Sequence, residues 1–436
     1  MSVQPPTVSV IGAGKMGLPV ACVFASRGAR VIVCDVNQRV VDEINAGISP
    51  IDEPGVPELL AESVASGALR STTDTASGAA TSDVVVILVP VLLTQDMRAD
   101  LAIIDGVAQV LSTSIRPGTM VSIETTLPVG GTRRIGKIIE GGGLEAGRDF
   151  DLVFSPERVK SKFVLRNLQV NPKIVGGITA EAASRAEAFY ARYLGAPVDN
   201  VGALETAEFA KLAGMVYRDV NIALANELAI YAEAHPIDFE RARAAANTDG
   251  EAAILVPGIG VGGHCTPVYP HFLINDSIER GTPARLARMS REINDLQPGR
   301  ALDRIERVTG SLSGRRVVIL GLGFRPGVKE HTNSPTFPIF QGLRERGAVP
   351  VVLDPLYADR EIAGYGLEPG DVAGADVAIL VTDHEAFRAV LPALARAGVQ
   401  TIFDGRRLWS AEEAEGLGLT YITHGAREVP PAVKSG

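Results

Sequence analysis

Short apolar runs alternate with longer stretches of mixed polarity through both halves of the chain. This pattern is typical of buried parallel strands that are separated by helices. The runs of the first half are Val8–Ile11, Arg30–Cys34, Asp83–Pro90 and Thr119–Gly130, and those of the second are Arg315–Gly327, Ala348–Pro355, Ala375–His384 and Val399–Arg406. We therefore predict an α/β fold with two Rossmann-like parallel sheets.

A long helix is predicted between the two halves, from Ala203 to His235. The segment has no proline before Pro236 and consists almost wholly of good helix formers. Apolar residues cover most of its faces, so we expect an all-α middle region packed around it. A lysine on such a helix usually extends its ammonium to water. The charged residues, which exclude a membrane span, are Glu205, Glu208, Lys211, Arg218, Asp219 and Glu227.

Composition narrows the class of protein. The 436 residues are 46% hydrophobic, as in a globular protein, and the net charge of −9 without a basic run argues against nucleic acid as a partner. Three cysteines make no disulfide framework, and no apolar stretch reaches the roughly 18 residues of a membrane span. The first residues lack the features of a signal peptide. We expect a cytoplasmic protein without a membrane or metal partner.

The first apolar run leads into a glycine-rich turn. The order is strand, GAGKMG, helix, strand and acid. Its three glycines permit the turn, the approach of a pyrophosphate and close helix packing, while the acid accepts ribose hydroxyls and repels a 2′-phosphate. This order predicts NAD. The residues expected to bind it are Gly12, Gly14, Lys15, Met16, Gly17, Asp35 and, in a later loop, Thr126.

Three loops carry further candidates for chemistry. Thr126 (in ETTLPVG) and Glu157 (in SPERV) follow strands, at the sheet edge where ligands bind. Neither residue alone indicates catalysis. The segment Leu255–Pro270 is rich in glycine and proline, which excludes regular structure, and it holds Cys265 beside His264. A cysteine is usually a small buried hydrophobe, but here the glycines let a ligand approach the thiol.

The second half repeats the glycine signature in part. GLGFRPG follows a strand, but Pro326 stands at the third glycine position. Arg325 offers a guanidinium to a pyrophosphate, so we expect a second phosphorylated nucleotide here. An arginine-rich helical stretch, Thr282–Val308, precedes this half, and residues 425–436 are predicted to form a frayed tail.

Seven motifs in order resemble those of the nucleotide-sugar 6-dehydrogenases, the UDP-glucose/GDP-mannose dehydrogenase family. They span nearly the whole chain and are GAGKMGLP, ISPIDEPGVPELL, ETTLPVG, SPERV, EFAKLAG with ALANE, PGIGVGGHC and GLGFRP. GGHC and RDVNIALANE are most similar to the UDP-N-acetylhexosamine branch. The resemblance implies NAD in the N-terminal sheet, a UDP-sugar in the C-terminal one, and a homodimer through the central helix.

The resemblance also implies roles for particular residues. Cys265 matches the nucleophile that forms a thiohemiacetal and then a thioester with the sugar. Lys211 matches the lysine that stabilises the oxyanion, Glu157 the acid that helps water to hydrolyse the thioester, and Thr126 the threonine near the nicotinamide. The reaction implied is a four-electron oxidation of the sugar C6 hydroxyl to the uronate. The substrate-binding residues implied are Lys211, Gly262, Phe324 and Arg325.

The sequence departs from the family pattern at three positions. Met215 replaces an asparagine four residues after the lysine, and Tyr269 replaces an aspartate four residues after the cysteine. Thr332 stands where an arginine is common. The first two replaced residues are expected to hold the catalytic water and the lysine. Tyr269 still offers a hydroxyl, and Arg218 or Asn221 lies about one helical turn further along.

Three domains and several functions follow from this interpretation. We predict an NAD domain over residues 1–200, a helical dimerisation and substrate domain over 201–300, and a UDP-sugar domain over 301–436. The expected substrate is UDP-N-acetylglucosamine or UDP-N-acetylmannosamine, with UDP-glucose as an alternative. A two-electron hydroxy-acid dehydrogenase and a non-catalytic sugar-nucleotide binder stay open, the latter because of Met215 and Tyr269.

Overall fold

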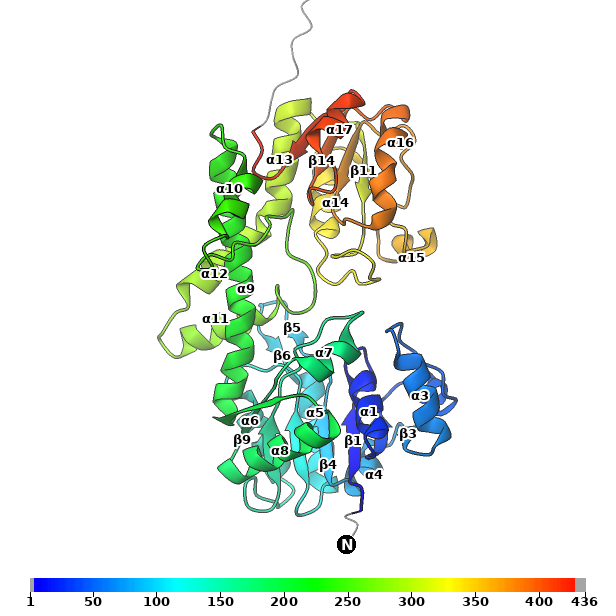
Figure 1. Cartoon of the computed structure of the whole chain (residues 1–436), viewed down its shortest axis with the longest axis vertical. Coiled ribbons are helices and arrows are strands. Elements are labelled where there is room, and N and C mark those ends of the chain that lie inside the picture. Colours follow the sequence, from blue (N-terminus) through cyan, green and yellow to red (C-terminus); the bar gives the residue numbers. More distant parts are fainter. Residues whose placement is uncertain (1–3, 428–436) are drawn as a thin grey trace, which may run out of the picture. The chain divides into compact units, whose positions relative to one another are not determined.

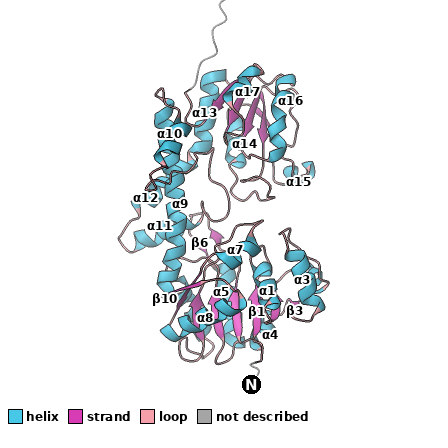
Figure 2. Ribbon diagram, in the orientation of Figure 1, coloured by secondary structure: helices cyan, strands magenta, loops and turns pink. Residues whose placement is uncertain are grey.

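The computed structural model describes residues 4–427. The chain divides into two compact units, Met1–Gly214 with His271–Gly281, and Met215–Pro270 with Thr282–Gly436. The long helix α9 (Leu204–Glu233) begins in the first unit and ends in the second. The predicted central helix is therefore confirmed. Figure 1 labels the elements, and Figure 2 colours them by type.

The first unit is a sheet with helices on both faces. Its elements are β1 Thr7–Ile11, α1 Gly17–Ser26, β2 Arg30–Cys34, α2 Gln38–Asn45, α3 Val56–Ala65, β3 Leu69–Thr72, α4 Thr75–Ala80, β4 Val84–Ile87, β5 Leu92–Leu93, β6 Ala99–Asp100, α5 Ala102–Ser114, β7 Met120–Ile123, α6 Gly131–Glu140, β8 Asp151–Phe154, α7 Val164–Val170, β9 Lys173–Gly177, α8 Ala180–Tyr193 and β10 Val198–Ala203. The α11 helix, Tyr269–Glu279, contributes most of its length.

The order of strands in this sheet is β10-β9-β8-β7-β4-β1-β2-β3. The parallel arrangement predicted for β1, β2, β4 and β7 is confirmed. Strands β3 and β8 also run parallel to them, so the loops after these strands meet at one edge. Strand β9 runs antiparallel to β8, which the sequence pattern did not predict. Because of this reversal, the first residue of β9 lies at the same edge as the last residues of β7 and β8.

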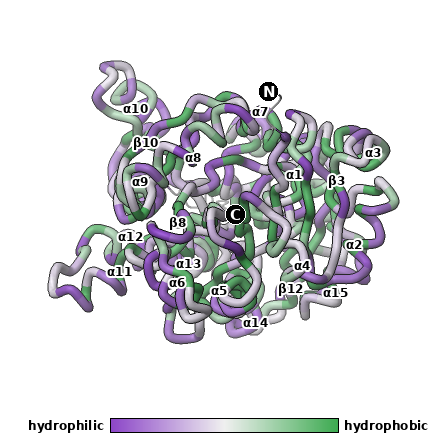
Figure 3. The backbone as a smooth tube through the Cα atoms, turned by 90° about the horizontal axis from the view of Figure 1, so that it is seen from below, coloured by the Kyte–Doolittle hydropathy of each residue, from purple (hydrophilic) through white to green (hydrophobic). Residues whose placement is uncertain are grey.

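Two helical layers cover the sheet. Helix α1 packs against α3 and α7, and together with α8 it forms one hydrophobic core over Val8 and Val10. On the other face α5 packs against α4 and α6. Every residue of α1 from Gly17 to Ala25 is buried, and the hydropathy of this helix can be followed in Figure 3. A helix that is apolar all round is one that packs on several sides.

The second unit contains a parallel five-stranded sheet of order β12-β11-β13-β14-β15. Residues of β11 alternate between two cores: Val317 and Ile319 face α13 and α14, whereas Val318 and Leu320 face α16 and α17. The elements of this unit after α9 are α10 Phe239–Ala246, α12 Arg285–Asp295, α13 Gln297–Thr309, β11 Arg316–Leu320, α14 Thr336–Glu345, β12 Val349–Leu353, α15 Asp359–Gly364, β13 Val377–Leu380, the 3-10 helix η1 Glu385–Val390, α16 Leu391–Arg396, β14 Thr401–Asp404, α17 Ala411–Gly416 and β15 Thr420–Thr423.

Buried ion pairs fix α9 to its neighbours in the second unit. Arg291 on α12 donates to Asp219 at 2.6 Å, and both side chains are almost fully buried. Further along, Arg304 on α13 donates to Glu233 at 2.7 Å. Arg304 also donates to the carbonyl oxygen of Ala426, and Glu233 accepts from the N–H of Gly425. The predicted frayed tail is therefore wrong for residues 425 and 426, and residues 428–436 lie outside the described part of the chain.

Several other predictions can be compared with the structure. The predicted two-sheet fold class is confirmed, with the reversal at β9 and β10 as the difference. The Leu255–Pro270 segment is irregular, as expected, until α11 begins at Tyr269. No helix within residues 4–427 is both long and apolar enough to cross a bilayer. The predicted boundaries at residues 200 and 300 stay a prediction.

Candidate active site

The glycine turn between β1 and α1 has the geometry of a dinucleotide site. Gly12 has φ of +102°, and a Cβ there would lie 2.5 Å from the carbonyl oxygen of Leu88. A Cβ on Gly17 would lie 1.9 Å from the carbonyl oxygen of Gly12, so neither glycine tolerates a side chain. Gly14 instead faces open space, with nothing within 4 Å of such a Cβ. This turn therefore leaves room for a pyrophosphate beside a glycine backbone.

The start of α1 is available to an anion. Its N-cap residue, Met16, makes no side-chain capping bond, and the first turn holds no acid. Free N–H groups and the helix dipole favour a phosphate at such a terminus. Lys15 is exposed on the same turn. These features fit the predicted NAD site, whose cofactor would supply the hydride acceptor.

Asp35 ends β2 and is held by two backbone groups. Its Oδ2 accepts from the N–H of Ala13 at 2.9 Å, and its Oδ1 accepts from the N–H of Asn37 at 2.9 Å. The carboxylate thus links the glycine turn to the end of the second strand. Its expected contact with the ribose hydroxyls stays a prediction.

The ETTLPVG loop after β7 is anchored by its neighbours. The hydroxyl of Thr125 donates to the carbonyl oxygen of Val89 at 2.8 Å, and Thr126 follows it in a buried position. At the far end of the loop, Glu208 of α9 accepts from the N–H groups of Gly130 and Thr132 at 2.6 and 2.7 Å. Burial raises the pKa of Glu208, although these hydrogen bonds oppose the shift.

Glu157 lies in a buried cluster of charges that sequence analysis did not identify. Its Oε2 accepts from Nζ of Lys173, the first residue of β9, at 2.9 Å. The same ammonium donates to Oε2 of Glu124, at the end of β7, at 2.6 Å. The hydroxyl of Tyr190 on α8 donates to the other oxygen of Glu124 at 2.7 Å. A charged residue that opens an otherwise apolar strand, as in KIVGG, was the available signal.

The ammonium of Lys211 is not extended to water, as that of a lysine on such a helix usually is. Only 7% of the residue is exposed, and Nζ donates to the backbone carbonyl oxygen of Glu157 at 2.5 Å. The structure therefore brings together two of the predicted catalytic residues, a lysine and a carboxyl-bearing residue. A buried cation in this position can stabilise a negative charge that develops on a substrate oxygen.

In the second unit, two asparagines of α9 hold the glycine-rich segment that leads to Cys265. Asn221 donates to the carbonyl oxygen of Ala253 at 2.7 Å and accepts from the N–H of Leu255 at 2.9 Å. Asn226 accepts from the N–H of Gly258 at 2.9 Å. The amide of Asn221 is therefore committed to this loop, which weakens the idea that it replaces the asparagine of the family.

The same segment packs against the GLGFRP loop. A Cβ on Gly262 would lie 2.3 Å from Cβ of Phe324, and one on Gly263 would lie 3.0 Å from its ring. The N–H of Gly263 donates to the carbonyl oxygen of Thr332, and Asn333 donates back to Gly263. Two predicted substrate-binding residues, Gly262 and Phe324, are thus in contact. This packing explains why only glycine fits at positions 262 and 263.

Cys265 is exposed, whereas the other two cysteines are buried. The N–H of Tyr269 donates to the carbonyl oxygen of Cys265 at 2.9 Å, and the tyrosine hydroxyl lies 3.4 Å from Nδ1 of His264. The residue that replaces the family aspartate therefore pairs with the neighbour of the cysteine. Met215 is half-buried and Arg218 is exposed on α9.

A carboxylate accepts hydrogen bonds from the backbone of the second glycine turn. Oδ2 of Asp354 accepts from the N–H groups of Leu322 and Gly323 at 2.6 and 3.2 Å and lies 3.2 Å from Nε2 of His384. Burial raises the pKa of Asp354, but His384 and the backbone donors lower it by more, so the group stays ionised. The Arg325 guanidinium lies 3.4 Å from Glu330.

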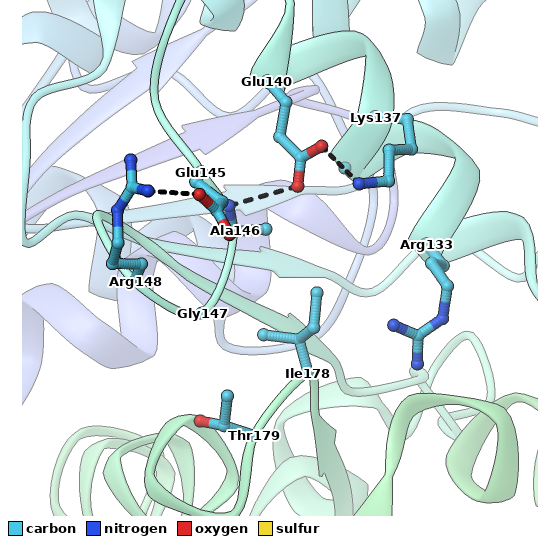
Figure 4. Close-up of a pocket in the computed structure, with 10 residues that line it drawn as sticks. Arg133, Lys137, Glu140, Glu145, Ala146, Gly147, Arg148, Ile178 and Thr179 are labelled. Atoms are coloured by element: carbon cyan, nitrogen blue, oxygen red, sulfur yellow. Dashed lines mark hydrogen bonds and ion pairs between the residues drawn. The ribbon is translucent and has the colours of Figure 1, made fainter.

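A separate pocket of about 390 Å³ lies in the first unit (Figure 4). It is lined by the end of α6 and by the loop before β8, so it lies at the sheet edge opposite the glycine turn. Most of its charges pair with one another, Lys137 with Glu140 and Arg148 with Glu145, while Arg133 pairs with Glu205 of α9. It contains none of the predicted site residues.

The glycine turn, the uncapped helix terminus and the buried acid–lysine cluster together fit a dinucleotide-dependent oxidoreductase. The chain belongs to the UDP-glucose/GDP-mannose dehydrogenase family. The family's NAD binding domain matches residues 6–194, its central domain residues 205–296 and its UDP binding domain residues 318–411. The protein is thus an NAD-dependent oxidoreductase that binds a UDP-sugar, which confirms the cofactor and the substrate class predicted from the sequence.

Similar proteins carry names from the amino-sugar branch of this family. An NDP-N-acetyl-D-galactosaminuronic acid dehydrogenase of Ralstonia nicotianae is 32% identical over 93% of this chain and 97% of its own length. A UDP-N-acetyl-D-mannosamine dehydrogenase of Pyrococcus horikoshii is 33% identical over 88% of this chain and 90% of its own.

Solved structures give the same fold. The UDP-N-acetylmannosamine dehydrogenase of Pyrococcus horikoshii has a TM-score of 0.88 and 30% identity, covering 97% of this chain and 100% of that one. The NDP-N-acetyl-D-galactosaminuronic acid dehydrogenase of Methanosarcina mazei has a TM-score of 0.84 and 28% identity, covering 97% and 96%.

The geometry at Asp35 predicts cofactor selectivity. In the Asp35→Ala/Asn37→Arg double variant the acid no longer repels a 2′-phosphate, and the new guanidinium can bind it. Hydrogen bonds to charged groups are worth about 1.5–3 kcal/mol, so the preference for NAD over NADP should fall by about ten- to a hundredfold. Fluorescence titration with both cofactors measures this ratio. Asn37→Arg alone is the control, and equal binding of both cofactors by the wild type would contradict the prediction.

Proposed function

We propose that the protein oxidises the C6 hydroxyl of a UDP-N-acetylhexosamine to the uronate in two successive NAD-dependent steps. The observation that carries the proposal is the hydrogen bond from the ammonium of Lys211 to the backbone carbonyl oxygen of Glu157, which places a buried cation beside a carboxyl-bearing residue in the NAD-binding unit. The GGHC motif and the names of the relatives favour an N-acetylated amino sugar, either UDP-N-acetylglucosamine or UDP-N-acetylmannosamine. UDP-glucose stays the alternative substrate.

The catalytic roles follow the chemistry of the side chains. Cys265 attacks the aldehyde to form a thiohemiacetal, which loses a hydride to become a thioester. Lys211 stabilises the oxygen charge that forms at each addition. Glu157 takes a proton from the water that hydrolyses the thioester, and Thr126 lies near the nicotinamide. Covalent capture keeps the aldehyde from leaving between the two oxidations.

Substrate and cofactor are assigned to different parts of the chain. Residues 1–200 bind NAD through Gly12, Gly14, Lys15, Met16, Gly17 and Asp35. Residues 201–300 supply the central helices, and residues 301–436 bind the UDP moiety with Phe324 and Arg325. Gly262 is assigned to the substrate as well, and it lets its segment pack closely against Phe324, because a side chain at that position would clash with Phe324.

Tyr269 and His264 take the place of the missing aspartate in this proposal. The pair offers a hydroxyl and an imidazole nitrogen beside the nucleophile but adds no fixed negative charge. Met215 offers no hydrogen bond of comparable strength. These departures affect the rate and not the stoichiometry, because neither Met215 nor Tyr269 is asked to form the covalent bond.

The first test is the stoichiometry of the reaction. Purified protein is mixed with NAD and a panel of UDP-sugars that includes UDP-glucose and UDP-N-acetylgalactosamine, and NADH absorbance is followed. Each accepted sugar should yield two NADH and one uronate, with no free aldehyde. Cys265→Ala should stop at one NADH or fewer. Cys265→Ser should leave a covalent ester that mass spectrometry detects.

The matched control is Cys34→Ala. Burial raises the pKa of the Cys34 thiol to about 11, so this cysteine is not a nucleophile at neutral pH. The control should retain two NADH per sugar. Wild-type protein that stops at one NADH with aldehyde present would overturn the four-electron proposal, and protein that oxidises no sugar while binding it would favour a non-catalytic role.

The second test concerns Lys211. Loss of a preorganised group that stabilises an oxyanion typically costs about a hundred- to a thousandfold in kcat. Lys211→Ala should show a loss of this size, with NAD affinity unchanged. Lys137→Ala, which removes a lysine exposed over 72% of its side chain, is the control. A mild loss in Lys211→Ala accompanied by a lower Tm would assign Lys211 a structural role.

We also propose a homodimer through α9. Tyr217, Leu224, Leu228 and Tyr231 recur in steps of seven, four and three residues, which return to one side of a helix, and all four are exposed. Exposed apolar stripes of this kind mark protein interfaces. Tyr217→Glu/Leu224→Glu should shift the protein from dimer to monomer in sedimentation equilibrium. Ile103→Glu, an exposed apolar site on α5, should not.

A further inference from the structure

The ammonium of Lys173 joins two carboxylates that follow different strands, Glu124 directly after β7 and Glu157 in the loop after β8. It lies 2.9 Å from Oε2 of Glu157 and 2.6 Å from Oε2 of Glu124. The side chains of Lys173 and Glu124 are 4% and 0% exposed, whereas that of Glu157 is 11% exposed. Of the two acids, therefore, Glu157 alone retains a contact with the surface, and Glu124 lies behind it.

A hydrogen-bonded chain extends from Glu124 into the core. The hydroxyl of Tyr190 donates to Glu124 and lies 2.8 Å from the hydroxyl of Ser122. Nζ of Lys173 also lies 5.1 Å from the centre of the Tyr190 ring, a cation–π distance. Buried charge clusters of this kind cost desolvation energy and persist when every member is satisfied.

We propose that Lys173, Glu124 and Tyr190 are positioning residues that keep Glu157 ionised and store the proton it takes from water. The proposal rests on the function proposed above and deepens it, because it gives the hydrolytic step a place for its proton. None of the three residues is asked to touch the substrate. They act through the carboxylate of Glu157.

The proton transfer balances without a further reactant. Water attacks the thioester carbon, its proton passes to Glu157, and the C–S bond breaks to release the Cys265 thiolate. Lys173 then donates one proton to Glu124 and accepts one from Glu157, so its charge is unchanged. Glu157 is again ionised and Glu124 is neutral. Reversal of the same transfer returns the proton to water through Glu157.

The charges around each acid favour this direction. Burial raises the pKa of Glu124 to about 7, and the Glu157 carboxylate adds to the shift, while Lys173 and Tyr190 oppose it. Burial also raises the pKa of Glu157, but Lys173, the N–H of Arg158 and Lys211 lower it by more. Lys173 itself is held protonated by the two carboxylates, although burial opposes this. Near neutral pH, Glu124 therefore holds a proton more tightly than Glu157 does.

The experiment compares Lys173→Met, which removes the cation, with Lys173→Arg, which keeps it. Without the cation the pKa of Glu157 rises, so the acidic limb of the kcat–pH profile should move to higher pH. General-base assistance contributes about a hundred- to ten-thousandfold, so kcat at pH 7 should fall at least about tenfold in Lys173→Met. The thioester on Cys265 should then accumulate in the mass spectrum. Lys173→Arg should restore most of the rate and the profile.

Arg291→Met is the matched control, because it breaks another buried ion pair, that with Asp219, in the second unit. It should lower Tm without moving the acidic limb. If Lys173→Met behaves in the same way, with a lower Tm and an unshifted profile, Lys173 is structural and the proposal is overturned.

A second readout does not depend on activity. ¹³C NMR of the carboxyl groups follows the titration of Glu124 and Glu157 in the NAD-free enzyme, with Glu124→Gln used to assign the signals. Glu124 should titrate near neutrality and Glu157 well below it. Tyr190→Phe, a mild change, should raise the pKa of Glu124 further because one hydrogen bond to its carboxylate is lost. If Glu157 titrates above Glu124, the proposal fails even in an active enzyme, whereas an enzyme that oxidises no UDP-sugar but shows the expected titrations refutes only the proposed function.

Discussion

One buried cation determines how the ends of three strands meet in the first unit. Glu124 directly follows β7, and Glu157 lies in the loop after β8. Two carboxylates at one buried edge repel each other and lose their hydration. The ammonium of Lys173 offsets both penalties at 2.6 and 2.9 Å. Lys211, from α9, adds a second positive charge against the same loop. The cluster therefore decides whether the two carboxylates can lie at the same buried edge. It also supplies the acidic and basic groups of the candidate site in this unit.

The features that the sequence predicts well are those with local causes. Buried parallel strands are continuous apolar runs, and a glycine turn needs particular residues at fixed positions, as the clash of any Cβ at Gly12 and Gly17 shows. The central helix follows from propensity and the absence of proline. The family motifs around the glycine turn, in the central helix and around Cys265 can be found in the sequence because each motif is a contiguous run of residues.

The charge cluster has causes that are not local. Glu124, Glu157 and Lys173 meet because β9 runs antiparallel to β8, which brings its first residue to the edge where the neighbouring strands end. A pattern of apolar runs predicts strands but not this reversal. For Lys211, extension to water stayed an alternative to the catalytic role, because the backbone carbonyl oxygen to which it donates lies 54 residues earlier in the chain and leaves no mark in the sequence around the helix. Asn221 was considered as a replacement for the asparagine that Met215 removes. Its hydrogen bonds to Ala253 and Leu255 weigh against that role, but they depend on the course of a loop that the sequence does not predict.

Two departures from the family pattern, Met215 and Tyr269, concern the surroundings of the lysine and the cysteine. Met215 and Tyr269 remove an amide and a carboxylate that the resemblance places near the lysine and the cysteine. The groups that carry charge around Glu157 are all present, and Lys173 binds both Glu157 and Glu124. Tyr269 lies against His264, the immediate neighbour of Cys265, and brings a hydroxyl but no carboxylate to it. In the proposed mechanism the base for hydrolysis therefore comes from the buried cluster, in which the ammonium of Lys173 binds both Glu124 and Glu157.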